Sequence, residues 1–344
     1  MRALFRCDAS AVVGSGHLSR CLTLARALQG EGFSVDVATR DPSDHTVDWI
    51  ERERCRAVII SGSTDDAAAT RSAAEGADLV VIDGYTFGPA FQAALGRADR
   101  VVCVVDDLAI GPVRADVVLN GNLYGASLAY EVEEGTELLC GPEYALVREE
   151  FVRAREERSR RAATPTRRLL VTMGGADPTG ETEKVITALH TSQGLADLTV
   201  TIVVGGANPR AEAIRTAVAR ALLVQRAEVL VDVRAMGTLM AECDVAVTAA
   251  GGTCLELACV GVPAAVVVVA DNQRCVAEAL SARGLMDVVG QSAAVDPALI
   301  GAAIMRLFED RDRSRAMETA QRACVDGRGS ERVAARLARV VRAP

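Results

Sequence analysis

The stretch that decides the fold is Val12-Val13-Gly14-Ser15-Gly16-His17-Leu18-Ser19-Arg20. An apolar run from Met1 to Cys7 precedes it and predicts a buried strand. The residues that follow have the spacing of one helical face: Leu18, Leu22, Ala25 and Leu28. Glycine lets main-chain N–H groups approach a ligand closely, and a helix N-terminus attracts anions. The sequence therefore predicts an anion-binding turn at Gly14 and Gly16, with the imidazole of His17 at its mouth.

Composition limits the class of protein. Half of the 344 residues are hydrophobic, which is enough for two domains that each have a full core. The net charge of −8 argues against a nucleic-acid partner, because such proteins usually present a basic surface. No apolar run reaches the roughly 18 residues of a membrane span, and no signal peptide precedes the first strand. The ten cysteines form no CxxC pair, so we expect a cytoplasmic protein with reduced thiols and neither disulfides nor zinc.

Short apolar strands alternate with amphipathic helices through the first half of the chain. After the first strand, we expect strands at residues 34–38, 57–61, 79–82, 101–105 and 117–119. Val- and Ile-rich runs of this kind are typical of a parallel sheet covered on both faces, where ligands bind at the carboxyl ends of the strands. Polar residues fall at those ends: Asp83-Gly84-Tyr85, Asp106-Asp107 and Asn120-Gly121-Asn122. We expect Asp106-Asp107 to form a solvated turn, in preference to a Mg²⁺ site.

A polar stretch, residues 149–168, interrupts this pattern with runs of Arg, Glu and Ser and with Pro165. A second α/β series follows, with strands expected at residues 169–173, 199–204, 229–233, 245–249 and 263–269. Its first strand leads into a glycine loop at Gly174 and Gly175. We therefore predict an α/β protein of two Rossmann-like domains, residues 1–160 and 166–330, whose parallel sheets face a central cleft, followed by a C-terminal segment, 331–344.

The second informative stretch runs from Thr248 to Pro263, where a strand ends, two glycines turn the chain and a short helix ends at Gly261. One interpretation places a pyrophosphate on the N–H groups around Gly252 and Thr253, with Glu256 accepting hydrogen bonds from ribose. The other interpretation is structural, since Thr253-x-x-Glu256 also fits a capping box in which both side chains satisfy the helix end. Spacing alone leaves both interpretations open.

Five blocks of sequence carry a family resemblance, in order along both halves. They are Arg6-x-Asp8 with Gly14-x-Gly16-His17, Gly141-Pro142-x-Tyr144-Ala145-Leu146, Met173-Gly174-Gly175-x-Asp177-Pro178, Ala250-Gly251-Gly252-Thr253-x-x-Glu256-Leu257-Ala258, and Ala270-Asp271-Asn272-Gln273. Together they resemble the nucleotide-sugar hydrolases of pseudaminic acid biosynthesis, which cleave UDP-2,4-diacetamido-2,4,6-trideoxy-β-L-altropyranose. That family is related to spore-coat polysaccharide proteins and resembles the glycosyltransferase that makes lipid II. The resemblance implies a GT-B fold whose C-terminal helix packs back on the first domain.

The resemblance also implies roles for individual residues. His17 matches the family's catalytic base. Positions expected around the sugar are matched by Gly14, Gly16, Asp8, Tyr85 and Asn272. Positions expected around the nucleotide diphosphate are matched by Gly174, Gly175, Gly251, Gly252, Thr253 and Glu256. Residues 120–137 form a long loop near the expected cleft that departs from the family's pattern.

The chemistry of the expected reaction is consistent with these residues. A UDP leaving group departs as a stable anion, so hydrolysis at the anomeric carbon chiefly needs a base that takes a proton from water. Positive potential at a helix N-terminus disfavours the imidazolium form of His17 and so keeps a neutral base. Neither a cofactor nor a metal is required, and no His, Asp or Cys cluster has ligand spacing. We expect the other histidines, His45 and His190, at the surface.

Two other functions remain open. A GT-B glycosyltransferase would use the same nucleotide-sugar donor but transfer the sugar to an acceptor. A nicotinamide enzyme is suggested by Gly14-x-Gly16-x-x-Ser19 with Asp36, a loose dinucleotide fingerprint. Ser19 replaces the third glycine of that fingerprint, and we expect Asp36 inside a strand and not at its end. The leading prediction is a UDP-sugar hydrolase that acts on a small-molecule substrate.

Overall fold

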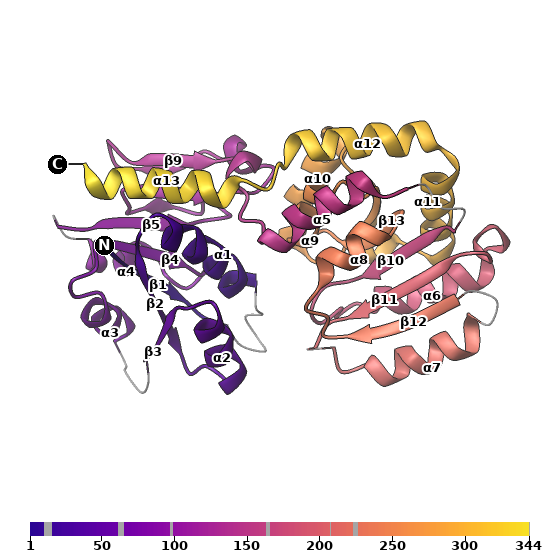
Figure 1. The fold of residues 1–344 in the computed structure, drawn as a ribbon, viewed down its shortest axis with the longest axis horizontal. Helices are drawn as coiled ribbons and strands as arrows, with labels where there is room; N and C mark the ends of the chain where they lie inside the picture. Colours follow the sequence, from indigo (N-terminus) through magenta and orange to yellow (C-terminus); the bar gives the residue numbers. More distant parts are fainter. Residues whose placement is uncertain are drawn as a thin grey trace. The chain divides into compact units, whose positions relative to one another are not determined.

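The computed structural model of the chain describes residues 1–9, 16–60, 65–96, 99–162, 166–206, 208–222 and 226–343. The chain divides into two compact units (Figure 1). The first unit comprises residues 1–147 together with 327–344, and the second comprises residues 148–326. Both are α/β units built on parallel sheets, as the sequence predicted.

The first unit contains a parallel sheet of seven strands. They are β1 (Arg2–Cys7), β2 (Ser34–Arg40), β3 (Arg56–Ile60), β4 (Leu79–Asp83), β5 (Val101–Val105), β7 (Val117–Asn120) and β9 (Glu137–Cys140). Their spatial order is β3-β2-β1-β4-β5-β7-β9. A separate short ladder pairs β6 (Pro112–Val113) with β8 (Glu131–Val132).

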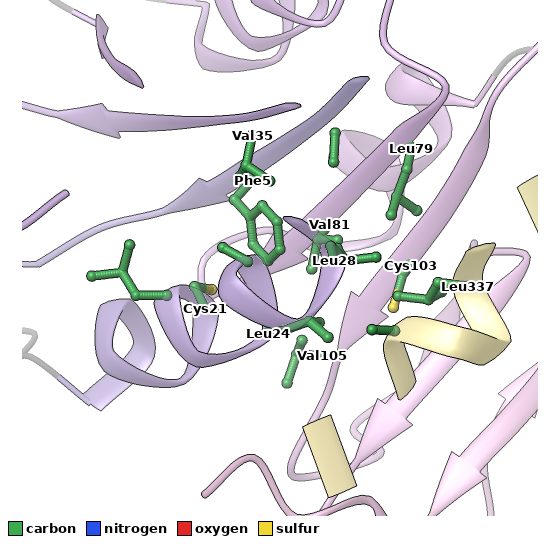
Figure 2. Packing of buried hydrophobic residues seen from close by; sticks show 14 of the residues in the cluster. Phe5, Cys21, Leu24, Leu28, Val35, Leu79, Val81, Cys103, Val105 and Leu337 are labelled. Atoms are coloured by element: carbon green, nitrogen blue, oxygen red, sulfur yellow. The ribbon is translucent and has the colours of Figure 1, made fainter. Parts of the chain in front are cut away.

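Helices cover both faces of this sheet, because alternate strand residues point to opposite sides. The helices of the unit are α1 (Gly16–Gly30), α2 (Asp44–Arg52), α3 (Asp66–Ala73), α4 (Pro89–Leu95) and α13 (Gly329–Arg342). Odd-numbered strand residues such as Phe5 and Val81 pack with α1 and α13, whereas even-numbered ones such as Leu4 and Val80 pack on the other side. Figure 2 shows the first of these layers, with Leu24, Leu28 and Leu337 beside the strand residues Phe5, Val81 and Cys103.

The second unit contains a parallel sheet of six strands. They are β10 (Arg168–Thr172), β11 (Thr199–Val204), β12 (Arg226–Val231), β13 (Val245–Ala249), β14 (Ala264–Val268) and β15 (Asp287–Gln291). Their spatial order is β12-β11-β10-β13-β14-β15. Its helices are α5 (Glu149–Arg160), α6 (Glu181–Thr191), α7 (Ala211–Ala221), α8 (Met236–Glu242), α9 (Thr253–Val260), α10 (Arg274–Ala282), α11 (Pro297–Glu309) and α12 (Arg311–Cys324).

Each sheet has one point at which the strand order reverses. In the first unit the chain runs outward from β1 through β2 and β3, then returns to β4 on the other side of β1. In the second unit the same happens between β10 and β13. The carboxyl ends of the two strands diverge at such a switch point, and open α/β sheets bind their ligands there.

Helix α5 lies in the second unit, so the change of unit falls at residue 148 and not near residue 160 as the sequence suggested. Its charged residues resemble a linker, but Phe151 and Ala154 are buried and the helix packs on α8 and α9. Arg155 donates to the carbonyl of Cys259 at 3.0 Å, and Arg161 donates to that of Cys243 at 3.1 Å. These carbonyls lie at helix C-termini, where cations are favourable. The arginine run therefore has a structural role.

Candidate functional site

His17 is the second residue of α1 and lies at the switch point of the first sheet. Its ring is 9% exposed. Nδ1 of His17 lies 2.7 Å from Oδ1 of Asp83, the last residue of β4. The register of the sheet explains the meeting, because Cys7 at the end of β1 is opposite Asp83. Among the described residues, two polar atoms contact the ring, both at Nδ1: Oδ1 of Asp83, and Nη2 of Arg20 at 3.1 Å. A guanidinium has no acceptor, so a proton on Nδ1 is donated to Asp83.

Asp83 is a buried carboxylate that stays ionised. Burial by itself would raise the pKa of Asp83, but the guanidinium of Arg20 and the hydrogen bond with His17 lower it to about 2. Nε of Arg20 donates to Oδ2 of Asp83 at 2.6 Å and Nη2 donates to Oδ1 at 2.6 Å. An ionised carboxylate is an acceptor only, so it receives the Nδ1 proton of a neutral His17 and leaves the Nε2 lone pair free.

Arg20 also binds a second carboxylate, that of Asp107 after β5. Its Nη1 lies 2.9 Å from each oxygen of Asp107. The amide of Asn122 donates to Oδ1 of Asp107 at 2.7 Å, and the hydroxyl of Tyr85 donates to Oδ2 at 3.2 Å. We call the set His17, Arg20, Asp83, Tyr85, Asp107 and Asn122 the His17 site.

Tyr85, which the resemblance places near the sugar, lies beside His17. Its ring centroid lies 4.9 Å from that of His17, and the two rings are nearly perpendicular at 84°. Burial around its hydroxyl and the nearby Asp107 carboxylate raise the pKa of Tyr85 to about 12. The side chain is nevertheless 61% exposed. Tyr85 therefore offers a neutral, accessible aromatic face beside the imidazole.

Asp107 is not the solvated turn residue that the sequence suggested, since it is only 7% exposed and paired with Arg20. Asp106 does act as a turn residue: its Oδ1 accepts from the N–H groups of Leu108 and Ala109 at 2.7 and 2.8 Å. The adjacent acids Asp106 and Asp107 therefore have different structural roles. Among the described residues, no group of three or more His, Cys, Asp or Glu side chains is arranged to hold a metal ion.

Gly16 and Asp8 were also expected around the sugar. Gly16 begins α1, and the space beside its Cα is open. Asp8 binds the buried Arg6 through both oxygens, at 2.5 and 3.0 Å, and accepts from the N–H of Arg40 at 2.8 Å. Asp8 thus faces Arg6 and β2, and no contact joins it to His17. Gly14 lies outside the described residues.

The loop that departs from the family's pattern is tied to the His17 site. Asn120 ends β7 without solvent exposure, and its Oδ1 accepts from N and Nδ2 of Asn122 at 3.0 and 2.9 Å. A side chain at Gly125 would meet the carbonyl of Asn120 at 2.6 Å, so glycine is required for this packing. Asn122 connects the loop to Asp107, a contact that no motif in the sequence indicated.

In the second unit, the glycines expected at the nucleotide lie at the switch point of the sheet. Gly174 and Gly175 follow β10, and Gly251 and Gly252 follow the adjacent strand β13. Gly174 has a left-handed φ of +77°, and all four glycines border open space where a side chain would stand. In the described part of the chain, the main-chain N–H groups of Gly252 and Thr253 have no acceptor. Free N–H groups at the start of α9 suit an anion.

Glu256 does not form the capping box that its spacing allowed. Helix α9 begins at Thr253, so Gly252 is the N-cap, and no side chain caps the helix. Oε1 of Glu256 lies instead 3.4 Å from Nη2 of Arg148, and the side chain is 24% exposed. Burial raises the pKa of Glu256 to about 7, with Arg148 opposing the shift and Glu150 adding to it. Glu256 is therefore poised between its neutral and ionised forms.

The sequence singled out four further residues, Asn272, His45, His190 and Asp36. Asn272 is exposed in a short 3₁₀ turn, Asp271–Gln273, after β14. His45 and His190 are exposed, as expected, and His190 binds the carbonyl of Ala221. Asp36 lies inside β2, where it accepts from Arg2 and Arg56. A nicotinamide enzyme would need that carboxylate at the strand end for a ribose, so the structure gives this alternative no support.

The curated relatives of the chain include a polysaccharide biosynthesis protein and a nucleotide-sugar hydrolase. The spore coat polysaccharide biosynthesis protein SpsG of Bacillus subtilis (strain 168) is 29% identical over 223 residues, 64% of this chain and 64% of that protein. The UDP-2,4-diacetamido-2,4,6-trideoxy-beta-L-altropyranose hydrolase of Campylobacter jejuni is 28% identical over 183 residues, 52% of this chain and 61% of that enzyme. The matches span less than two thirds of the length of either relative. A scan against protein-family models finds no match.

Solved structures of similar fold cover nearly the whole chain. MurG from Acinetobacter baumannii has a TM-score of 0.70 at 18% identity, over 98% of this chain and 99% of that one. UDP-GlcNAc 2-epimerase from Neisseria meningitidis, bound to UDP-GlcNAc, has a TM-score of 0.66 at 13% identity, over 98% and 100%. At these identities the likeness shows the fold alone. The described helices include none that is long and apolar enough to cross a bilayer. The chain is thus a homologue of the spore-coat polysaccharide protein and of the UDP-diacetamido-altropyranose hydrolase, and it has the GT-B fold.

Proposed function

We propose that this chain is a nucleotide-sugar hydrolase that releases UDP and a free sugar by attack of water at the anomeric carbon. The observation that carries the proposal is the pairing of His17 with Asp83, at 2.7 Å between Nδ1 and Oδ1. The pairing leaves Nε2 as the acceptor of a proton from water. The ionised carboxylate then stabilises the imidazolium that forms, as in other base–orienter pairs.

The leaving group is assigned to the second unit. The diphosphate binds the free N–H groups at the start of α9 and the open glycine loops after β10 and β13. These dipoles offset the charge that develops as the glycosidic bond breaks. Glu256 accepts from the ribose hydroxyls. In this scheme the reaction proceeds with water, a base and a stable leaving group, without a metal or cofactor.

The sugar is assigned by homology to the altropyranose hydrolase. We propose a 2,4-diacetamido-2,4,6-trideoxy sugar on UDP, and with it a place in the synthesis of a pseudaminic-acid-like sugar in the cytoplasm. Asp8, Asn272 and the glycines at 14 and 16 are proposed sugar contacts on the same basis. Tyr85 is better supported, because its accessible ring lies beside His17.

A glycosyltransferase is the second candidate, because MurG has a similar fold over nearly the whole chain. The test is incubation of the protein with UDP-2,4-diacetamido-2,4,6-trideoxy-β-L-altropyranose and with UDP-GlcNAc in ¹⁸O-labelled water, without an acceptor. A hydrolase releases UDP at a catalytic rate and puts the label on the anomeric carbon. A transferase leaves the UDP-sugar largely intact, and label in the UDP would mean cleavage at phosphorus.

A further inference from the structure

The orientation of His17 depends on more than one carboxylate. Arg20 binds Asp83 through two nitrogens, and such a two-pronged contact sets the plane of a carboxylate as well as its position. The Asp83 side chain has no solvent exposure, so no water competes for its oxygens. Sγ of Cys21 adds a weak contact to Oδ2 at 3.4 Å. The direction in which Oδ1 faces the imidazole is therefore set by Arg20.

Arg20 is held in turn at its other end. Nη1 lies between the two oxygens of Asp107, so all three guanidinium nitrogens have carboxylate partners. Asp107 is positioned by Asn122 at 2.7 Å and by the Tyr85 hydroxyl at 3.2 Å. Rotation of Arg20 would break the contacts with both carboxylates together. The guanidinium therefore acts as a rigid spacer between Asp107 and Asp83.

We propose that Arg20 and Asp107 are positioning residues for His17, and that Asn122 links the 120–130 segment to them. Asp107 holds Arg20, Arg20 holds Asp83, and Asp83 holds the Nδ1 proton of the imidazole. The inference rests on the proposed function in treating His17 as the base. It gives the loop that departs from the family's pattern a defined role, which is to anchor the far end of this chain of contacts.

The test is ¹⁵N NMR of the full chain with labelled histidine, which reports the ring nitrogen that carries the proton. Only three histidines need assignment, and His45→Gln and His190→Gln supply it. The wild type is expected to show the Nδ1-protonated neutral form of His17. Arg20→Lys keeps the positive charge but cannot bind Asp83 through two nitrogens at once. Asp107→Asn keeps the shape of the side chain but removes its negative charge. Each is expected to bring in the Nε2-protonated form and to lower kcat by about 10- to 100-fold.

The matched control is Asp106→Asn, the same change at the neighbouring acid, whose side chain binds the N–H groups of Leu108 and Ala109. It is expected to leave the tautomer and kcat at wild-type values. An unchanged His17 tautomer in folded Arg20→Lys and Asp107→Asn would overturn the proposal. If Arg20→Lys and Asp107→Asn do not fold, the test uses Asn122→Ala, which removes a single hydrogen bond from Asp107. A wild-type histidine spectrum in Asn122→Ala would then overturn the positioning proposal.

The spectroscopic measurement needs no substrate, so the two proposals can fail separately. A wild-type protein that releases no UDP from any UDP-sugar would count against the proposed hydrolase alone. A normal rate with an Nε2-protonated His17 would count against the positioning network alone. Thermal unfolding of each variant shows whether a change in tautomer accompanies a loss of structure, and only variants that remain folded are compared.

Discussion

Nδ1 of His17 and Oδ1 of Asp83 lie 2.7 Å apart although the residues are 66 positions apart in the chain. His17 is the second residue of the helix that follows β1, and Asp83 ends β4, the strand beside β1. The two residues meet because β1 and β4 are adjacent strands at the point where the strand order of the sheet reverses. In the proposed reaction, this pairing orients the imidazole as the base.

His17→Ala is expected to lower the turnover of UDP-sugar by roughly 10²–10⁴-fold, the usual contribution of a general base. UDP affinity should be unchanged, because the proposed nucleotide-binding residues belong to the second unit. The measurements are the rate of UDP release and a calorimetric titration with UDP. His45→Ala, at an exposed histidine, is the control. Turnover within about threefold of wild type would remove His17 from the mechanism.

Asp83→Asn is expected to cost about as much turnover as the loss of the imidazole itself, on the order of 10²-fold or more. The Asn amide can donate to Nδ1 and so favour the Nε2-protonated form, which cannot accept a proton from water. The pKa of Asp83 is about 2, so the carboxylate stays ionised from pH 5 to 8 and the wild type should show no loss of this pairing there. Single-turnover rates at pH 7 give the comparison. A variant with wild-type kcat would show that the carboxylate is not needed.

Glu256→Gln is expected to weaken UDP binding with little effect on folding. Helix α9, in which Glu256 lies, has no side-chain cap, so the substitution removes no cap. Gln supplies only one acceptor oxygen where the carboxylate has two. Calorimetry with UDP and thermal unfolding separate binding from stability. Thr253→Ser keeps a hydroxyl at the neighbouring position and serves as a conservative control. Equal UDP affinity in wild type and Glu256→Gln would leave Glu256 without a role in the nucleotide site.

UDP affinity is expected to rise between pH 6 and pH 8. The pKa of Glu256 is about 7 because of burial, so its ionised form, the one proposed to accept from both ribose hydroxyls, is depleted below that pH. Affinity should then fall by up to about tenfold per pH unit on the acid side. UDP itself gains a proton near pH 6, and the residual slope in Glu256→Gln measures that contribution. Identical slopes in the two proteins would contradict the assignment.

Asp8→Ala is expected to lower the free energy of unfolding by about 1–3 kcal/mol. The Arg6 side chain has no solvent exposure and, among the described residues, would keep Asp66, 2.9 Å away, as its one carboxylate partner. Urea unfolding measures the change, with Asp48→Ala at an exposed position of α2 as control. The family pattern instead predicts a sugar contact, which would raise KM and leave stability unchanged. The two results distinguish a structural Asp8 from a binding one.

Short-range features of the chain were predictable because neighbouring residues determine them. Continuous apolar runs predicted most strands of the two sheets, although not β9 or β15, and glycines marked many of the turns where strands end. The end of α9 at Gly261 follows from its left-handed φ of +83°, a conformation that glycine adopts without strain. The same local signals brought Gly252 and His17 to strand ends in a parallel sheet, where ligands bind.

The salt-bridge and hydrogen-bond partners of individual side chains were harder to predict. Arg20 stands three residues after His17, on the same helical face, so its nearness was readable in the sequence. The pairing of Arg20 with Asp83 and Asp107 could not be predicted, because any of the 46 acidic residues could form a salt bridge with an arginine. Spacing likewise allowed Glu256 to cap its helix, whereas the structure pairs it with Arg148, 108 positions away.

The sequence by itself thus determined the fold class and most of the strand ends, because backbone conformation and burial follow from local pattern. Tertiary structure alone decided that α5 belongs to the second unit, that Asp107 is buried and that Asp83 orients His17. These outcomes depend on which strands become neighbours and on how charges are paired once water is excluded. Both are properties of the packed chain as a whole, and no short segment encodes them.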